Sequence, residues 1–281
     1  MKLIFNLQGR LGNIFFIFSA FYYALKNNIE SYIYIPEYVM DYINNNDFLN
    51  ELYNKINNFT LTNFNKSKYI NLYDKENENN IHIIDLYDIL KKYNNQSINI
   101  NFECVMFQNC KYFLQYKNEI KKIFINETEN TLKYKQIISE NDVLIFVRRT
   151  DYITYKFYIL NENYYIDMYN KYFTGKNIYV TSDDIDWCKE NLTINKFAGL
   201  KNIYYINDLN PIETITICQY FSNFICSNST FSMMGELFSN YENKKVIAVK
   251  NISKIMKRNN GFDKCILYDL NDKNNYKYIN D

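Results

Sequence analysis

Histidine is almost absent from this sequence, since His82 is the only one among 281 residues. With a single histidine, we expect neither a histidine-rich metal site nor Ser-His-Asp or Cys-His catalysis. The six cysteines include no C-x-x-C pair and lie in or near apolar segments. This pattern predicts reduced, buried thiols in a cytoplasmic protein and argues against a disulfide framework.

No excess of charge of either sign is present, because 32 Lys and Arg residues oppose 31 Asp and Glu residues. The formal net charge is +1. No global field therefore attracts the chain to nucleic acid or to an anionic membrane, and we expect neither as a partner. An anion site would have to be local.

Long hydrophobic runs are missing as well. The opening MKLIFNLQGRLGN differs from a signal peptide, because Arg10 and Asn13 interrupt its apolar run and no small-residue cleavage site follows. The next apolar run, 14–25, is too short to cross a bilayer. We therefore expect a cytoplasmic protein without a membrane anchor.

Apolar residues are plentiful at 47%, enough for a full core, and they form strands that alternate with helices. In the first part we expect a strand at 2–7, a glycine turn, a helix at 13–26 and a strand at 31–35, followed by helices and long loops over 41–80. Further on, the pattern predicts strands at 142–147, 177–181, 202–206, 223–227 and 245–249, with helices at 161–173, 184–192, 231–239 and from Pro211. This alternation predicts an α/β fold with a parallel sheet of Rossmann type. The tail from Asn271 is expected to fray.

Four polar clusters follow predicted strands and precede predicted helices. They are 8–13, 148–152, 181–184 and 227–231. Ligands of parallel α/β sheets bind at the carboxyl ends of the strands, so each cluster is a candidate part of a site.

The first cluster, QGRLGN, contains Gly9 and Gly12 in a chain with only six glycines. This spacing predicts a turn with positive φ or a close approach of the backbone to a ligand. The alternative is a plain strand-to-helix turn in which Asn13 caps the helix.

The second cluster, VRRTDY, contains Arg148, Arg149 and Asp151. Guanidinium groups bind phosphate oxygens in bidentate fashion, and Asp151 could hold one arginine while the other binds the ligand. The alternative is a solvated ion pair, although such pairs contribute only about 0–1 kcal/mol to stability.

The third cluster, TSDDIDWCKEN, contains the spacing Asp184-Ile185-Asp186, which some transferases use to bind a divalent metal. We favour a helix cap by Ser182 or Asp183, with one aspartate of the turn free to accept hydrogen bonds from a base or a ribose.

The fourth cluster, CSNSTFS, places Ser227, Ser229 and Thr230 at a predicted helix N-terminus. Hydroxyl and free N–H groups there suit a phosphate. A capping cluster without a ligand is the alternative.

The four clusters GRLGNI, FVRRTDY, SDDIDWCKEN and NSTFSMMGEL, in this order, resemble the α-1,2-fucosyltransferases, glycosyltransferase family 11. The resemblance implies an α/β, GT-B-like fold of two Rossmann-type halves with parallel sheets. These would be an acceptor-side domain at 1–138 and a nucleotide-sugar-binding domain at 139–281. It also implies an inverting glycosyltransferase that needs no metal or other cofactor. This enzyme would move fucose from GDP-fucose to a hydroxyl of a glycan acceptor, typically the galactose 2-OH.

The resemblance also assigns roles. The catalytic residues would be Arg148, Arg149 and Asp151, with an arginine neutralising the leaving diphosphate. Asp183 or Asp184 would contact the nucleoside. The implied substrate-binding residues are Gly9, Arg10, Gly12, Asn13, Ser182, Asp183, Asp184, Asn228, Ser229, Thr230 and Phe231.

The chain departs from the family pattern at several positions. Phe146 replaces a histidine, Thr150 a glycine, Ile14 a glutamine, and Met233-Met234 a tryptophan pair. These changes suggest a more apolar sugar pocket, so another deoxysugar such as rhamnose remains an alternative donor. A non-catalytic module that binds a nucleotide or sugar, and a metal-dependent transferase built on Asp184 and Asp186, are further alternatives.

Overall fold

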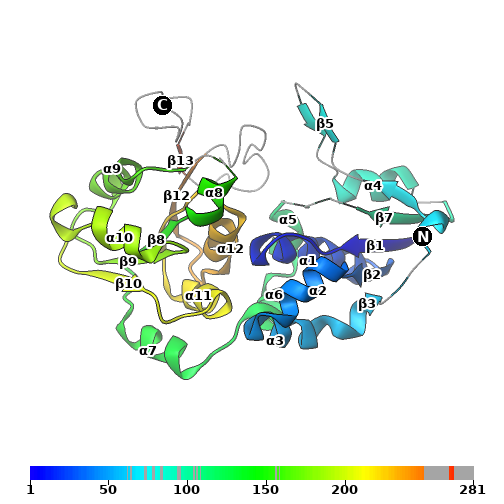
Figure 1. Ribbon diagram of the computed structural model, residues 1–281, viewed down its shortest axis with the longest axis horizontal. Coiled ribbons are helices and arrows are strands. Elements are labelled where there is room, and N and C mark those ends of the chain that lie inside the picture. The colour runs from blue at the N-terminus through cyan, green and yellow to red at the C-terminus, as the bar shows by residue number, and fades with distance from the viewer. Residues whose placement is uncertain are drawn as a thin grey trace. The chain divides into compact units, whose positions relative to one another are not determined.

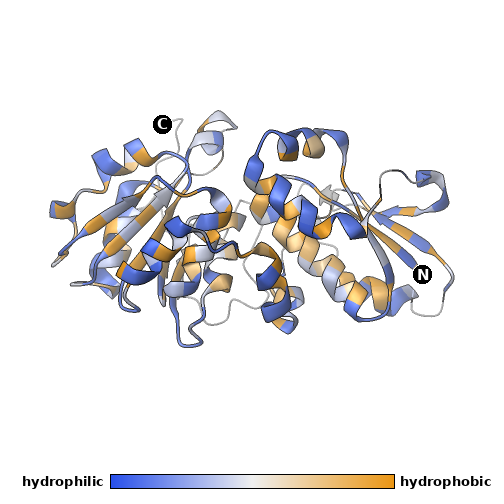
Figure 2. Cartoon of the chain, turned by 90° about the horizontal axis from the view of Figure 1, so that it is seen from below, coloured by the Kyte–Doolittle hydropathy of each residue, from blue (hydrophilic) through white to orange (hydrophobic). Residues whose placement is uncertain are grey.

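The computed structural model describes residues 1–249 and 266–268, except for positions 62, 64, 73, 74, 78, 79, 83, 84, 94, 95, 104, 106, 108, 156 and 158. The chain divides into two compact units, Met1–Phe124 and Ile125–Asp281. Each unit is an α/β body around its own parallel sheet (Figure 1). Apolar positions recur along the helices and strands of each unit (Figure 2), as expected where both elements cover a common core.

The first unit alternates strands with helices. Its strands are β1 (Lys2–Asn6), β2 (Glu30–Tyr34), β3 (Thr60–Leu61), β4 (Ile70–Leu72), β5 (Lys75–Asn77), β6 (Asn80–His82) and β7 (Asn99–Phe102). Its helices are α1 (Leu11–Lys26), α2 (Glu37–Asn44), α3 (Asp47–Ile56), α4 (Leu86–Tyr93), α5 (Lys111–Gln115) and α6 (Lys117–Phe124), with 3-10 turns at Asn57–Phe59 and Lys66–Lys68. The parallel sheet has the order β3-β2-β1-β7-β4, while β5 and β6 form a separate antiparallel pair. The expectation of helices and loops for 41–80 missed β3 to β6, because strands of two or three residues carry no readable periodicity.

The turn between β1 and α1 differs from the expected one. The helix begins at Leu11 with Arg10 as its N-cap, not at Asn13. The carbonyl of Arg10 accepts hydrogen bonds from the N–H groups of Asn13 (2.9 Å) and Ile14 (3.1 Å), so the first helical turn is already closed there. Gly9 has a φ of +69°, and a Cβ at this position would lie 2.3 Å from Nδ2 of Asn13. The expected need for glycine is therefore confirmed at Gly9.

A chain of asparagine side chains crosses three strands of the first sheet. Nδ2 of Asn6 donates to Oδ1 of Asn101 (3.1 Å), and Nδ2 of Asn101 donates to Oδ1 of Asn71 (2.9 Å). Asn101 is fully buried and Asn6 nearly so. Buried amides need such partners, so the three side chains connect β1, β7 and β4.

The second unit repeats the alternation around a larger sheet. Its strands are β8 (Val143–Val147), β9 (Ile178–Ser182), β10 (Ile203–Ile206), β11 (Asn223–Ile225), β12 (Lys245–Val249) and β13 (Ile266–Tyr268). Its helices are α7 (Glu129–Ile137), α8 (Thr150–Thr154), α9 (Glu162–Tyr172), α10 (Ile185–Asn191), α11 (Pro211–Ile217) and α12 (Thr230–Phe238), with 3-10 turns at Ile194–Lys196 and Cys218–Tyr220. The sheet is parallel in the order β10-β9-β8-β11-β12-β13. The predicted strands and helices of 142–249 are confirmed, and the tail from Asn271 lies outside the described residues.

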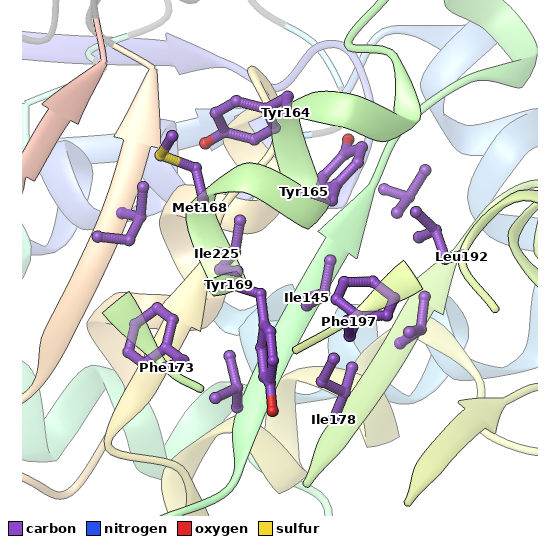
Figure 3. Close-up of a cluster of buried hydrophobic side chains, with 14 of the residues drawn as sticks. Ile145, Tyr164, Tyr165, Met168, Tyr169, Phe173, Ile178, Leu192, Phe197 and Ile225 are labelled. Carbon is purple, nitrogen blue, oxygen red and sulfur yellow. The ribbon is translucent and has the colours of Figure 1, made fainter. Parts of the chain in front are cut away.

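Helices cover both faces of the second sheet (Figure 1). On one face, tyrosines of α9 pack against β8, β9 and β11 (Figure 3). On the other face, α12 lies so close to β8 that a Cβ on Gly235 would be 2.4 Å from Cζ of Phe146. All five residues of β8 are buried, so both faces of the strand are covered, as its apolar run predicts.

The division between the units falls after Phe124, earlier than the expected boundary between 138 and 139. The intervening helix α7 is fastened to the second unit by side chains. The hydroxyl of Thr128 donates to Glu213 (2.6 Å), and the hydroxyl of Tyr134 donates to Asp208 (2.7 Å). These long-range contacts assign α7 to the second unit.

Two further expectations concern membranes and thiols. No helix in the described part of the chain combines the length and the apolar character needed to cross a bilayer. Cys110, Cys188, Cys218 and Cys226 are buried, as expected. Cys104 and Cys265 lie outside the described residues.

Candidate functional site

Three of the four polar clusters meet at one edge of the second sheet. Strand β8 lies between β9 and β11, all three strands are parallel, and Val147 pairs with Ser182 at the carboxyl end. The loops after these strands are therefore neighbours in space.

Arg148 is held by two carboxylates. Its Nη2 lies 2.6 Å from Oδ2 of Asp151, and its Nη1 lies 3.0 Å from Oδ2 of Asp183. All three side chains are mostly buried, at 17–18% exposure. Because both terminal nitrogens already have acidic partners, Arg148 is suited to fixing the loop after β8.

Asp183 accepts several hydrogen bonds from the same loop. Its carboxylate receives the N–H of Arg149 (2.9 Å), the N–H of Thr150 (3.1 Å) and the hydroxyl of Thr150. Together with Arg148, these donors tie the ends of β8 and β9 to each other. The expectation that Ser182 or Asp183 caps α10 is wrong. The cap is Asp184, which accepts from the N–H of Trp187 (3.3 Å).

Arg149 is oriented by different partners. Its Nε donates to Oδ2 of Asp184 (3.1 Å), and its guanidinium carbon lies 4.0 Å from the ring centroid of Trp187. Among the described residues, these contacts use Nε and the flat face of the group, which leaves Nη1 and Nη2 for a ligand. The side chain is only 15% exposed, so a bound anion would be partly desolvated and would interact strongly with it.

The loop after β11 presents the N-terminus of α12. Ser229 is the N-cap, and its Oγ accepts from the N–H of Ser232 (3.2 Å) and lies 2.8 Å from Oγ of Ser227. The N–H groups of Thr230 and Phe231 belong to the first turn and have no intrahelical acceptor. The positive end of the helix and these donors favour an anion.

Tyr152 links the loop after β8 to the loop after β11. Its hydroxyl donates to the carbonyl of Asn228 (3.0 Å), and the guanidinium of Arg148 lies 5.6 Å from its ring centroid. Neither Tyr152 nor Trp187 was among the expected site residues, although both stand inside the motifs that carry the resemblance. Their place inside these motifs was the available signal, since the contacts with Arg148 and Arg149 exist only in the folded chain.

The charges of the site nearly cancel. Two guanidinium groups and three carboxylates, those of Asp151, Asp183 and Asp184, leave a formal charge of −1. Anion binding therefore depends on the nitrogens of Arg149 and on the N-terminus of α12. Cys188 is an inert thiol beside this network, because burial raises its pKa to about 12.

The remaining cluster, QGRLGN at 8–13, lies in the first unit, in the turn that leads into α1. Arg10 is exposed, Asn13 is half-buried and Gly12 is buried within the helix. Gln8 is buried, and among the described residues its Nε2 has no hydrogen-bond partner. The role of Gly9, Arg10, Gly12 and Asn13 in binding a sugar stays a prediction.

The departures from the family pattern are mostly core positions. Phe146 is 2% exposed and packs edge-on against Phe231, with centroids 6.0 Å apart. Ile14, Met233 and Met234 are equally buried. These side chains therefore change the packing beneath the loops. The fourth departure, Thr150, adds its hydroxyl bond to Asp183.

Asp184 and Asp186 form ion pairs with different basic side chains of the protein. Asp184 pairs with Arg149, whereas Asp186 lies 3.2 Å from Nζ of Lys189 and is 85% exposed. Within the described ranges, no group of three or more His, Cys, Asp or Glu residues has a geometry that could hold a metal ion.

Sequence comparison finds similarity to a glycosyltransferase and to a polymerase subunit. An α-1,2-colitosyltransferase from Escherichia coli is 29% identical over 147 residues, which cover 48% of this chain and 50% of that protein. A DNA-directed RNA polymerase subunit beta from Theileria parva is 29% identical over 273 residues, 92% of this chain but 24% of that protein. The chain thus spans half of one relative and about a quarter of the other.

Among solved structures, a glycosyl transferase family 9 protein from Veillonella parvula DSM 2008 has a TM-score of 0.50, with 11% identity, over 99% of this chain and 92% of that one. At this identity, the likeness concerns the fold. Together with the two parallel-sheet units, it confirms the expected GT-B-like fold class. The sequence model of glycosyl transferase family 11 matches residues 2–265, nearly the whole chain. The protein therefore belongs to glycosyl transferase family 11.

Proposed function

We propose that this protein is an inverting glycosyltransferase that moves fucose from GDP-fucose to a hydroxyl of a glycan acceptor, such as the galactose 2-OH. The observation that carries the proposal is Arg149. Its Nε and ring face are fixed by Asp184 and Trp187, and its terminal nitrogens remain available at the edge where α12 begins. Family membership supports sugar transfer as the reaction.

In this reaction the acceptor oxygen attacks the anomeric carbon of the donor. The bond between that carbon and the phosphate oxygen breaks, its electron pair leaves with GDP, and the acceptor hydroxyl loses its proton. Negative charge grows on the diphosphate as the bond breaks. The Nη groups of Arg149 and the N–H groups of Thr230 and Phe231 are the donors that would stabilise it. No metal is required in this scheme.

Arg148 supports the site in this proposal. Because Asp151 and Asp183 bind both of its terminal nitrogens, it holds the β8 and β9 loops in place. Asp183 is engaged by the same loop and is 18% exposed, whereas Asp184 is 29% exposed, so Asp184 and its neighbour Ser182 are the better candidates for contacts to the nucleoside. Ser182 already orients the turn, because its Oγ accepts from the N–H of Asp184 (2.9 Å).

The donor sugar has alternatives. Rhamnose is one, and the name of the Escherichia coli relative adds colitose. A non-catalytic binding module was suggested by Phe146 and Ile14, but both side chains lie in the cores of their units. Their burial removes the reason for expecting a defective site.

The deciding experiment begins with thermal unfolding in the presence of GDP, UDP, CDP and ADP. A ligand at 100 times its Kd should stabilise the protein by about 2.7 kcal/mol, and we expect this for GDP. Nucleotide sugars are then screened with lactose as acceptor, with and without EDTA. Absence of stabilisation by GDP would refute the GDP-sugar proposal. GDP binding without release of GDP from any donor would indicate the binding module, and loss of activity in EDTA would indicate the metal-dependent enzyme.

A further inference from the structure

Three large apolar side chains are exposed directly after the arginines. Ile153 is 41% exposed, Tyr155 67% and Phe157 55%. They stand on α8 and the residues that follow it, in the second unit (Figure 1). Single exposed apolar residues are common, but three within five positions beside a candidate ligand site form a patch, and such patches often mark a binding surface.

The patch is ordered by its own backbone. The N–H of Tyr155 donates to the carbonyl of Asp151 (2.8 Å), and the N–H of Phe157 donates to the carbonyl of Tyr152 (2.8 Å). The rings of Tyr155 and Phe157 lie 6.0 Å apart at 41°, and Phe157 packs edge-on against Tyr152 at 5.4 Å. A ligand would therefore meet rings whose positions are already restricted, which lowers the entropy cost of binding.

The patch is continuous with the candidate diphosphate site. Tyr152 contacts Phe157 on one side, while its hydroxyl bonds to the carbonyl of Asn228 and its ring receives the guanidinium of Arg148. A molecule that lies on Tyr155 and Phe157 is thus one aromatic ring away from the groups that would hold the phosphates.

Size and chemistry indicate the occupant. An aromatic side chain offers roughly 150–250 Å² in all, so the exposed parts of Tyr155, Phe157 and Ile153 amount to a few hundred Å². A specific protein partner needs about 800 Å² on each side. A sugar ring has the right size, presents apolar C–H faces, and keeps its hydroxyls at the rim. A guanine base would need acceptors for its N–H groups, and the exposed side chains of the patch offer only one phenol oxygen.

We propose that Tyr155 and Phe157 form a stacking platform for a pyranose ring of the acceptor glycan. This inference rests on the proposed transferase function and extends it to the acceptor. It assigns to two residues outside the recognised motifs a role in selecting the substrate.

The test compares Tyr155→Ala and Phe157→Ala with the wild-type protein, with lactose as the acceptor probe and GDP-fucose saturating. We expect the KM for lactose to rise roughly 3- to 10-fold in each variant, as for the loss of one aromatic contact. The Kd for GDP and the acceptor-independent release of GDP from GDP-fucose should change less than about 2-fold, because the platform does not touch the diphosphate. Tyr155→Trp should retain the wild-type KM, since it keeps a ring.

Ile137→Ala is the matched control. Ile137 is 58% exposed in the same unit, and its carbonyl lies near the hydroxyl of Tyr179, close to the start of β9 and thus at the opposite edge of the sheet. It should leave the KM for lactose unchanged. An unchanged KM in both Tyr155→Ala and Phe157→Ala would overturn the platform, and a raised Kd for GDP would assign the rings to the nucleobase instead.

Saturation-transfer NMR with lactose and an array of other glycans separates this inference from the proposed function, because it requires no turnover. If GDP fails to bind but glycan signals vanish in Tyr155→Ala, the donor proposal fails and the platform stands. If the wild-type protein binds GDP but no glycan on the array, the platform is wrong and the donor site stands.

Discussion

Replacing Gly235 by alanine should destabilise the second unit, although alanine is the better helix former. The added Cβ would lie 2.4 Å from Cζ of Phe146, 3.1 Å from its Cε2 and 3.2 Å from Sγ of Cys218. Carbon atoms in ordinary contact are about 3.5–4.0 Å apart, so the ring and α12 must separate by more than about 1 Å. Phe146 has no space to yield, because it is 2% exposed in the middle of the sheet.

Two opposing terms set the size of this effect. Alanine in place of glycine inside a helix stabilises by about 1 kcal/mol, while overpacking a tight core costs about 1–3 kcal/mol. We therefore expect a net loss of about 1 kcal/mol, and more if the whole of α12 shifts. Phe146→Leu should relieve the overlap, so the double variant should be more stable than the sum of the single changes by at least about 1 kcal/mol.

Urea unfolding followed by tryptophan fluorescence suits this measurement. Trp187 is the only tryptophan and lies in the second unit, so the signal reports on the unit that carries the substitution. Phe146→Leu alone is the control for the cavity that the shorter side chain leaves. A Gly235→Ala variant as stable as the wild-type protein, or a coupling energy near zero, would refute the proposed contact between β8 and α12.

Three other perturbations follow from the contacts described above. Arg149→Lys keeps the charge but loses the Nε bond and the flat stacking surface, so kcat should fall about 100-fold or more while the urea midpoint stays nearly constant; equal activity would remove Arg149 from the phosphate site. Lys244→Met leaves the 2%-exposed carboxylate of Glu236 without its cation and should cost about 3 kcal/mol in the same unfolding assay, most of it recovered when Glu236→Gln is added; an unaltered midpoint would show that the pair is dispensable. At pH 8 the Cys188 thiol, with a pKa raised to about 12 by burial, is protonated, so iodoacetamide followed by mass spectrometry should modify it only after unfolding, and rapid labelling of the native protein would contradict its burial.

Much of the second unit was predictable from the sequence because its strands are buried on both faces. Such strands leave continuous apolar runs, as in β8, and polar residues then mark where each run ends. The position of the candidate site after β8, β9 and β11 followed from that pattern together with the rule for parallel sheets.

The sequence predicted that Asp151 holds one arginine and leaves the other for a ligand, but it did not show which arginine takes which role. Arg148 and Arg149 are neighbours of the same type, and only the fold shows that one meets Asp151 and Asp183 while the other meets Asp184 and Trp187. The place of α7 was also hidden, because its partners stand roughly eighty residues away in the sequence. The spacing of residues along the chain does not reveal such long-range contacts.

The asparagine chain of the first unit restricts how its sheet can form. Asn6, Asn101 and Asn71 can bond in series only if β1, β7 and β4 pair in the observed register, in which Asn101 faces Asn71. A slip by one residue would turn the amides toward opposite faces and bury Asn101 without partners, at about 1–3 kcal/mol for each unsatisfied group. Apolar side chains alone would tolerate such slips more readily. The three amides therefore favour the observed strand register. Their main effect is to raise the free energy of sheets with a slipped register, more than to lower that of the native sheet.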